Sequence, residues 1–349
     1  MPGRSICVCA VQAPFIVGGA EILVAELSSQ LKARGFLVDV VNVPFKWYPV
    51  RDLVKQALVW RFLEVTESNG APVDLVIATK FPSYLVRHPV KVTWLFHQHR
   101  EVYDLYGTPY CSFTDDPEEQ EIRRTIMRMD GKTLRESRAI YTISKNVSAR
   151  LERFNGISST ALYPPPRYAG RYARGPFGDY VLFAGRLDPL KRVDLLVETF
   201  RHVRSGARLI LAGTGPQREN LVRQIERLKL EDRVVLAGFV PEDELLSLYS
   251  GAFAALYAPV DEDYGYVTVE AFLSGKPVIT CSDSGGTLEF VEDGVTGRVV
   301  EPNPEALASV VDALYENRAW ARELGEAGRP KAAAIDWDHV IDALTAPLK

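Results

Sequence analysis

The stretch YVLFAGRLDPLKRVDLLVETF, residues 180–200, joins a short apolar run to an amphipathic one through a glycine turn. The apolar run Tyr180–Ala184 has the length and character of a buried strand, and a helix is expected from Lys191 onward. Apolar runs of this kind alternate with longer amphipathic segments along the whole chain, which is the pattern of βαβ units and a parallel sheet. The sequence therefore predicts an α/β protein. Its further expected strands are Ile6–Val11, Leu37–Val43, Leu75–Thr79, Val92–Phe96, Ile140–Ile143, Leu209–Ala212, Val234–Ala237, Phe253–Tyr257, Val278–Thr280 and Gly297–Val300.

A chain of 349 residues is longer than one hydrophobic core usually accommodates, so two domains are expected. The alternation breaks at Pro164-Pro165-Pro166, and the Gly-, Arg- and Tyr-rich stretch that follows has no periodicity, which favours a linker. The predicted organisation is a Rossmann-like domain at 1–165, a linker at 166–178, a second Rossmann-like domain at 179–335, and a C-terminal helix at 336–349 that crosses back to the first domain.

Charge and cysteine content narrow the partners and the setting. A formal charge of −4 argues against nucleic acid as the main partner, because phosphate-backbone binders carry a basic excess. Residues 1–165 hold 20 Lys and Arg against 17 Asp and Glu. This small excess leaves room for a contact with an anionic membrane, although a solvated surface explains it as well. The four cysteines lack metal-ligand spacing, so we expect free thiols and a cytoplasmic setting.

The first ten residues lack the charged start and long apolar run of a secretory signal, and no apolar stretch reaches the ~18 residues of a membrane span. Any membrane contact is therefore expected to be peripheral, at the inner face of the membrane.

Two cations follow the strand at Tyr180–Ala184. Arg186 lies in the turn and Lys191 at the start of the next helix. At the carboxyl end of a parallel strand, a planar guanidinium and a compact ammonium are suited to hold a diphosphate. The alternative is a pair of surface side chains that lie over the edge of the sheet.

The segment 258–271 contains two carboxylates eight positions apart. Glu262 lies in a loop after an apolar strand, Gly265 makes a turn, and Glu270 lies inside the next helix. The two acids would occupy separate places, so that one meets a sugar and the other a ribose. The first amides of that helix, at residues 266–268, are suited to phosphate oxygens. Loop acids taken alone are more often only solvated.

Two glycine turns also lie between a strand and a helix: Gly18-Gly19-Ala20-Glu21 and Gly213-Thr214-Gly215-Pro216. Glycines at such turns let the backbone approach an anionic ligand. Neither turn is the dinucleotide fingerprint, and the second expected strand ends in Val43-Pro44 without a ribose-binding acid. Both turns are also consistent with a purely structural role.

With these motifs the chain resembles family four of the retaining glycosyltransferases, which have the GT-B fold. The resemblance covers nearly the whole length and is carried by the two glycine turns, by Gly185-Arg186-Leu187 with Lys191, and by Glu262 and Glu270 in that family's Glu-x7-Glu spacing. It implies two Rossmann-like domains that face a central cleft, acceptor on the N-terminal side and donor on the C-terminal side.

The resemblance also implies roles for individual residues. Arg186 and Lys191 would bind the donor diphosphate, Glu270 the ribose hydroxyls, and Glu262 the transferred sugar, with His97 beside that sugar. His97, Glu262, Arg186 and Lys191 are thus the expected catalytic residues. The expected donor-binding residues are Gly18, Gly19, Arg186, Lys191, Gly213, Gly238, Phe239, Glu262, Tyr264, Gly265, Tyr266, Val267, Thr268 and Glu270. On sequence alone, a lone histidine after an apolar run is more often a core residue.

The resemblance has local departures. Asp263 stands where many relatives have Gly or Ser, and Tyr264 replaces the usual Phe. The run Asp261-Glu262-Asp263 also concentrates like charge in one loop.

Acceptor recognition is expected in the first half, at His99, Arg100, Tyr103 and Tyr106, because aromatic side chains suit sugar faces. Ordinary core packing is the alternative for these residues. By family analogy the acceptor is a glycan, a lipid-linked glycan or a small molecule, and the donor a UDP- or GDP-linked hexose in glycan biosynthesis.

No cofactor or metal is expected, because no Asp-x-Asp motif ends a strand and the cations would stabilise the departing diphosphate. Retention of configuration is open to double displacement or to front-face attack. The second is favoured because no carboxylate of the first half is placed convincingly beside His97. Two other functions fit the motifs less fully: a two-domain sugar-nucleotide epimerase and a non-catalytic protein that binds nucleotide sugars.

Overall fold

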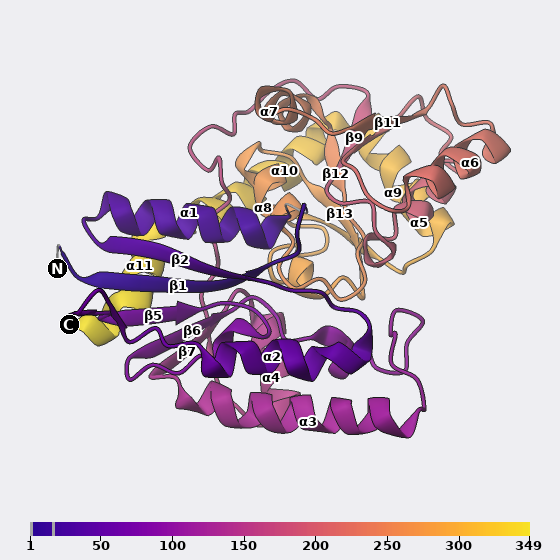
Figure 1. Ribbon diagram of the computed structural model, residues 1–349. Helices are drawn as coiled ribbons and strands as arrows, with labels where there is room; N and C mark the ends of the chain where they lie inside the picture. Colours follow the sequence, from indigo (N-terminus) through magenta and orange to yellow (C-terminus); the bar gives the residue numbers. More distant parts are fainter. Residues whose placement is uncertain (1–2, 16–17) are drawn as a thin grey trace. The chain divides into compact units, whose positions relative to one another are not determined.

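The computed structural model describes residues 3–15 and 18–349, and the chain divides into two compact units. The first unit comprises Met1–Arg167 together with Asp336–Lys349, and the second comprises Tyr168–Ile335. Each unit is built on its own parallel sheet (Figure 1). The α/β prediction with two Rossmann-like halves is therefore confirmed.

The first unit contains a six-stranded sheet in the order β2-β1-β5-β6-β7-β8, in which every pairing is parallel. The central strands β5 and β6 are buried along their whole length, as expected for a sheet covered on both faces, and β6 buries Lys91 and Thr93 together with its apolar residues. The strands are β1 (Ser5–Gln12), β2 (Leu37–Pro44), β5 (Leu75–Ala78), β6 (Lys91–Leu95), β7 (Ala139–Thr142) and β8 (Thr160–Ala161). A separate antiparallel pair, β3 (Glu67–Ser68) and β4 (Ala71–Pro72), was not expected.

Five helices surround this sheet in the described part of the first unit: α1 (Gly19–Ala33), α2 (Leu53–Phe62), α3 (Pro117–Thr133), α4 (Lys145–Asn155) and α11 (Trp337–Thr345). Helix α1 packs along β1 and β2, and α2 lies beside α3 (Figure 1). Helix α11, at the C-terminal end of the chain, contacts α1, and its Trp337 ring meets Trp94 of β6 at 6.3 Å between centroids.

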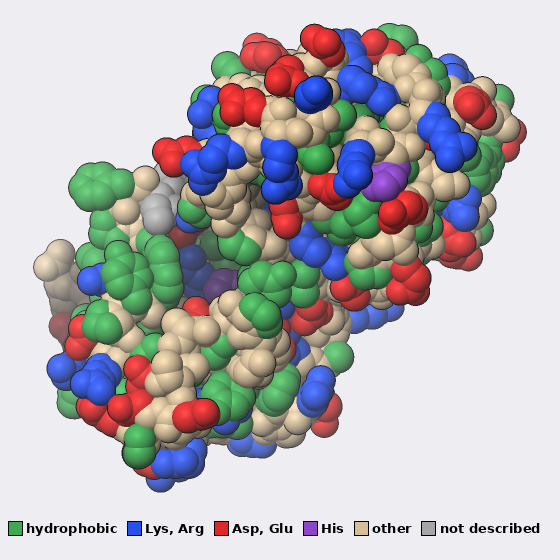
Figure 2. All heavy atoms as spheres, turned by 90° about the vertical axis from the view of Figure 1, so that its right-hand side faces the viewer, with side chains coloured by type: hydrophobic (Ala, Val, Ile, Leu, Met, Phe, Trp, Pro, Cys, Tyr) green, Lys and Arg blue, Asp and Glu red, His purple; other side chains and the backbone are tan. Residues whose placement is uncertain are grey.

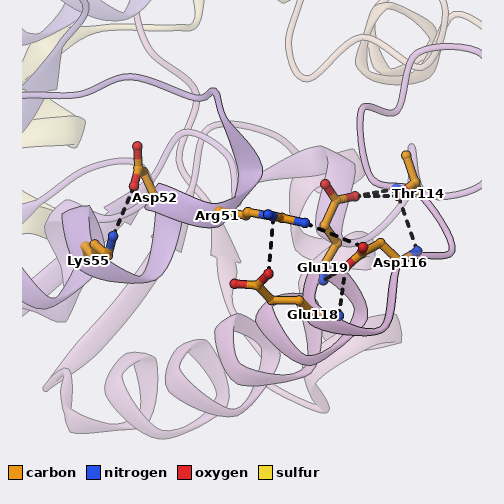
Figure 3. A network of polar contacts seen from close by, with 7 residues as sticks. All are labelled: Arg51, Asp52, Lys55, Thr114, Asp116, Glu118 and Glu119. Carbon is orange, nitrogen blue, oxygen red and sulfur yellow. Dashed lines mark hydrogen bonds and ion pairs between the residues drawn. The ribbon is translucent and has the colours of Figure 1, made fainter.

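Ion pairs connect the start of α2 with the start of α3 (Figure 3). Asp116 accepts bonds from the amides of Glu118 and Glu119, which caps α3, and a proline occupies the first helical turn. Arg51, just before α2, pairs with Asp116 at 3.5 Å and with Glu118 at 3.3 Å. These side chains are largely exposed, so the network orients the two helices more than it stabilises the fold.

The second unit contains a six-stranded parallel sheet in the order β11-β10-β9-β12-β13-β14, the order of a dinucleotide-binding fold. Its strands are β9 (Tyr180–Ala184), β10 (Arg208–Ala212), β11 (Val234–Gly238), β12 (Ala254–Leu256), β13 (Val278–Cys281) and β14 (Gly297–Val300). Its helices are α5 (Val193–Thr199), α6 (Arg218–Leu228), α7 (Glu242–Gly251), α8 (Tyr266–Leu273), α9 (Pro304–Glu316) and α10 (Arg318–Ala333).

Each sheet has one point where the chain reverses its direction of travel across the strands. This point lies between β1 and β5 in the first sheet and between β9 and β12 in the second. In open α/β sheets, ligands bind outside the carboxyl ends of the strands at such a reversal. A ligand site is therefore expected at the loops after these four strands.

The segment 168–178, expected as linker, belongs to the second unit. Tyr172 is buried there, and its ring packs edge-on against Tyr249 of α7 at 5.7 Å between centroids. This segment therefore packs within the second unit, although its sequence has no periodicity.

Candidate active site

Lys191 and Glu262 meet at the reversal point of the second sheet. Lys191 ends the 3₁₀ turn Pro189–Lys191 after β9, and Glu262 lies in the loop after β12, the neighbouring strand. The Lys191 ammonium pairs with Glu262 Oε2 and donates to the Tyr257 hydroxyl at 3.1 Å. The Tyr257 hydroxyl donates in turn to Glu262 Oε2 at 2.7 Å. One lysine, one tyrosine and one glutamate thus form a closed triangle.

The charges of this triangle are strongly coupled. Burial alone would lower the pKa of Lys191, but the adjacent Glu262 carboxylate outweighs burial, and the pKa is raised. Burial and the same carboxylate raise the pKa of Tyr257 well above its usual value. The lysine is therefore a cation and the tyrosine a neutral hydrogen-bond donor at physiological pH.

Arg186 is exposed in the turn just after β9. It shares an electrostatic neighbour with the triangle, because the Asp188 carboxyl interacts with Lys191, Glu262 and Arg186, while burial raises the pKa of Asp188. The structure therefore gathers both predicted cations and one predicted acid at one edge.

Glu270 lies in α8 and bonds elsewhere. Its Oε2 accepts a hydrogen bond from the Tyr249 hydroxyl at 2.6 Å, and burial raises the pKa of Glu270. Tyr249 is within electrostatic reach of Tyr257, which connects the two acids through tyrosines. Neither tyrosine was singled out in the sequence. Tyr257, in the apolar run 253–257, offered one signal: it is the single polar side chain of that run.

Helix α8 begins at Tyr266, directly after Gly265, so its positive dipole end lies between the two acids along the chain. Gly265 has φ +83°, and a Cβ there would approach Thr287 Oγ1 to 2.8 Å. Tyr264 is buried and packs edge-on against Tyr266 at 5.0 Å between centroids, while Val267 and Thr268 are also buried. At the helix start, Thr268 Oγ1 is buried without a hydrogen-bond partner.

The glycines after β10 bring strand-end loops together. A Cβ on Gly213 would lie 1.7 Å from the Gly185 carbonyl oxygen, and one on Gly215 would lie 2.3 Å from the Leu187 carbonyl oxygen. The Gly213 amide donates to the Gly238 carbonyl at 2.7 Å. Phe239, the next residue, is 81% exposed. These glycines have a structural role that holds whether or not a ligand contacts them.

In the first unit, Gly18 and Gly19 start α1 at the reversal point of the sheet. The Gly18 amide donates to Glu21 Oε2 at 2.9 Å, and Glu21 Oε1 pairs with Lys80 at 2.9 Å. Partial burial would raise the pKa of Glu21, but Lys80 and the Gly18 amide outweigh it, and the pKa is lowered. Lys80 follows β5 and was missed, although a lysine directly after a buried strand was a usable signal.

The expected acceptor-side residues differ in exposure. His97 is half-buried, and its Nδ1 bonds the Gln98 carbonyl at 2.7 Å. His99 is buried among Phe45, Phe81 and Phe113, and burial lowers its pKa to about 4. His99 is therefore neutral and packs like an aromatic core residue.

The remaining three also make internal contacts. The buried Tyr103 donates its hydroxyl to Asp130 at 2.7 Å. Arg100 donates to Asp104 at 2.6 Å, and Tyr106 lies under the Arg123 guanidinium at 3.7 Å from the ring centroid. The alternative of core packing thus applies to His99 and Tyr103, whose rings face the interior rather than a surface.

Two general features complete the description. Among residues 3–15 and 18–349, no group of three or more His, Cys, Asp or Glu side chains is arranged to hold a metal ion. None of the helices in the described ranges combines the length and apolar character that crossing a bilayer requires.

Part of the chain is similar to a known protein family. Residues 177–331 match the model of the family described as glycosyl transferases group 1. An uncharacterized glycosyltransferase of Methanocaldococcus jannaschii is 26% identical over 94% of this chain and 93% of its own length. The D-inositol 3-phosphate glycosyltransferase of Nocardia farcinica is 30% identical over 65% of this chain and 53% of its own length. The chain thus spans about half the length of that relative.

The fold is shared with solved structures. HepE of Anabaena, in complex with UDP and glucose, superposes with a TM-score of 0.72 at 18% identity, over 98% of both chains. At this identity the likeness shows the fold, which is GT-B. Residues 177–331 are thus similar to the glycosyl transferases group 1 family, and the chain has the GT-B fold.

Proposed function

We propose that this protein is a retaining, metal-independent hexosyltransferase that moves a hexose from a UDP- or GDP-linked donor to a glycan, lipid-linked or small-molecule acceptor. The observation that carries the proposal is the pairing of Lys191 with Glu262 at the reversal point of the second sheet, beside Arg186. A diphosphate needs cations and a sugar needs a carboxylate. Both groups are supplied here by adjacent strand-end loops.

The cations act on the leaving group. When the glycosidic bond to the donor breaks, negative charge grows on the departing diphosphate, and the anomeric carbon gains oxocarbenium character. Lys191 and Arg186, with the positive end of α8, are preorganised donors for that charge. This chain's own side chains thus supply the electrostatic stabilisation, which is why we propose that no metal is needed.

The acids would divide the donor between them. Glu262 would accept hydrogen bonds from hydroxyl groups of the transferred sugar, and Glu270, held by Tyr249, would accept hydrogen bonds from those of the ribose. We also propose that His97, which follows β6, takes part in binding the sugar. We propose front-face attack, in which the departing phosphate takes the acceptor proton.

Relatives support a nucleotide donor. The structure of HepE contains UDP and glucose, and the relative from Nocardia farcinica is named for transfer to D-inositol 3-phosphate. We propose by this likeness that the donor base is uracil or guanine and that the acceptor is rich in hydroxyl groups.

A ligand panel followed by a hydrolysis assay tests the proposal. UDP, GDP and ADP are each added at about 100 times Kd, where binding contributes about 2.7 kcal/mol, so one of them is expected to raise Tm by about 5–10 °C. The matched UDP- or GDP-hexose is then expected to be hydrolysed slowly without acceptor, and Glu262→Ala to abolish that hydrolysis. Glu316→Ala, an exposed acid in the same unit, is the control. Hydrolysis that survives in Glu262→Ala would contradict the proposal.

We further propose a peripheral membrane contact through the first unit. Trp47, Tyr48 and Phe62 are 39%, 52% and 82% exposed, before and at the end of α2. The neighbouring acids and bases pair with one another (Figure 3), and both signs are interspersed on the face drawn in Figure 2. Apolar burial would therefore drive binding more than charge.

Sedimentation with phosphatidylcholine vesicles, with and without phosphatidylglycerol, measures this contact. Burial of one Phe side chain contributes about 1.5–3 kcal/mol, so Phe62→Ser is expected to weaken vesicle binding by about tenfold to 100-fold. Val295→Ser, which removes a 46% exposed side chain from the second unit, should change nothing. Equal sedimentation of the two variants would rule the contact out.

A further inference from the structure

Arg192 is the neighbour of Lys191 in the chain, but its guanidinium points to other loops. Nε donates to the Ala258 carbonyl at 2.7 Å, and Nη2 donates to the Pro259 carbonyl at 2.8 Å. Nη1 and Nη2 also form a two-pronged pair with Asp283, at 2.8 and 2.6 Å. The side chain is only 14% exposed. Such a bidentate pair has a fixed geometry that a pair joined by a single contact lacks.

These four bonds join three strand-end loops of the second unit. Arg192 belongs to the loop after β9, Ala258 and Pro259 to the loop after β12, and Asp283 to the loop after β13. Backbone bonds run between the same loops: the Val260 amide donates to Leu190 at 2.8 Å, and the Asp261 amide donates to Asp283 at 2.9 Å. Glu262 is the next residue. Its position is therefore determined by the segment that Arg192 holds.

The backbone of Arg192 is in an uncommon conformation. Its φ of +47° and ψ of +42° are left-handed, a region that non-glycine residues seldom occupy. A glycine would adopt this conformation without strain but would leave two carbonyls and a carboxylate without their guanidinium. The strained residue is thus compensated by the contacts of its side chain.

We propose that Arg192 is a positioning residue for sugar transfer: it sets Glu262 opposite Lys191 without touching the donor. The inference rests on the proposed function, in which Glu262 contacts the transferred sugar and Lys191 the diphosphate. The inference predicts that sugar binding and nucleotide binding respond differently to the loss of the guanidinium. Loss of the guanidinium moves the sugar-binding carboxylate, whereas the groups that hold the nucleoside diphosphate stay in place.

Arg192→Lys is the decisive variant, because lysine keeps the charge but cannot replace the planar fork. A displacement of about 1 Å in a reacting group can lower the rate about 100-fold, so kcat for donor hydrolysis is expected to fall about 30- to 100-fold. UDP and GDP lack the sugar, and the groups that hold the diphosphate stay in place. The affinity for UDP or GDP should therefore remain within about threefold of that of the parent protein, a smaller change than the tenfold that 1.4 kcal/mol produces.

Arg233→Lys is the matched control. The Arg233 guanidinium also donates to main-chain carbonyls of the second unit, those of Val203, Ser205 and Ala207, at 2.7 to 2.9 Å. The three carbonyls precede β10 and Arg233 precedes β11, so these contacts lie at the amino ends of the strands, whereas Arg192 joins loops at the carboxyl ends. Both variants should lose comparable stability, but only Arg192→Lys should lose kcat. Equal kcat losses in the two, or an unchanged kcat in Arg192→Lys, would overturn the proposal.

Hydrogen exchange of the ligand-free protein separates this inference from the proposed function. Peptides that span residues 258–265 should exchange faster in Arg192→Lys than in the parent or in Arg233→Lys. If the parent hydrolyses no nucleotide sugar, the proposed function fails, and with it the positioning role. If the parent hydrolyses a donor and exchange over 258–265 is unchanged in Arg192→Lys, only the inference about Arg192 fails.

Discussion

Replacement of Lys191 by methionine is expected to lower kcat/KM for donor hydrolysis by about 10³-fold, the effect of removing one preorganised donor from a developing anion. The ammonium pairs with Glu262 and bonds Tyr257, so the variant loses the cation nearest the proposed diphosphate and leaves the carboxylate without its partner. Most of the loss should appear in kcat, because the charge on the diphosphate grows toward the transition state. Steady-state kinetics with the matched UDP- or GDP-hexose measures it.

Lys276→Met is the control for burial. The Lys276 side chain is also buried in the second unit, where it donates to the Gly175 and Pro176 carbonyls at 3.0 Å each. Both variants lose a buried ammonium and should be less stable by thermal denaturation. A similar fall of kcat/KM per folded molecule in Lys276→Met would show that the effect of Lys191 is one of folding rather than of chemistry.

Gly213→Ala is expected to have the largest effect on stability, at least about 3 kcal/mol, which lowers Tm by about 6–12 °C in a unit of this size. Its new Cβ would lie 1.7 Å from the Gly185 carbonyl oxygen, and backbone atoms cannot yield as the end of a side chain can. The strand-end loops after β9 and β10 would have to separate. Calorimetry of the purified variant measures the loss.

Gly238→Ala is the comparison, because the two glycines lie on neighbouring strand ends. At Gly238 the φ of +70° disfavours alanine, but no atom lies within 4 Å of the added Cβ. The expected cost is then only conformational, about 1–2 kcal/mol. Equal losses in the two variants would mean that backbone conformation, and not the close approach of the loops, governs Gly213.

The fold class could be predicted from the sequence because the strands of parallel sheets leave a recognisable pattern of apolar residues. Strands covered on both faces read as apolar runs, and Tyr180–Ala184 and Gly297–Val300 appear in the structure at the expected bounds. The two-residue strands β3, β4 and β8 were not predicted, since two residues carry no periodicity. The packing of Tyr172 against Tyr249 was not predicted either, because the two residues are distant in sequence.

For the site, spacing identified chemistry but not contacts. Lys191 and Glu262 were selected as a cation and an acid at strand ends, and their pairing follows from the adjacency of β9 and β12. The sequence does not distinguish His99 and Tyr103 from aromatic residues at a surface, but in the structure both side chains are buried in the core. Burial depends on which loops pack over a side chain, and no local pattern records that.

The sequence by itself determined that the chain forms two α/β units with parallel sheets, because hydrophobic periodicity and turn residues act within one element. It also determined which acids and cations follow the strands. The tertiary structure decided that Tyr257 joins Lys191 to Glu262, and that Arg192 turns away from its neighbour to hold the loops after β12 and β13. The physical reason is that hydrogen bonds between loops depend on strand order and register, which bring together residues some 70 to 90 positions apart.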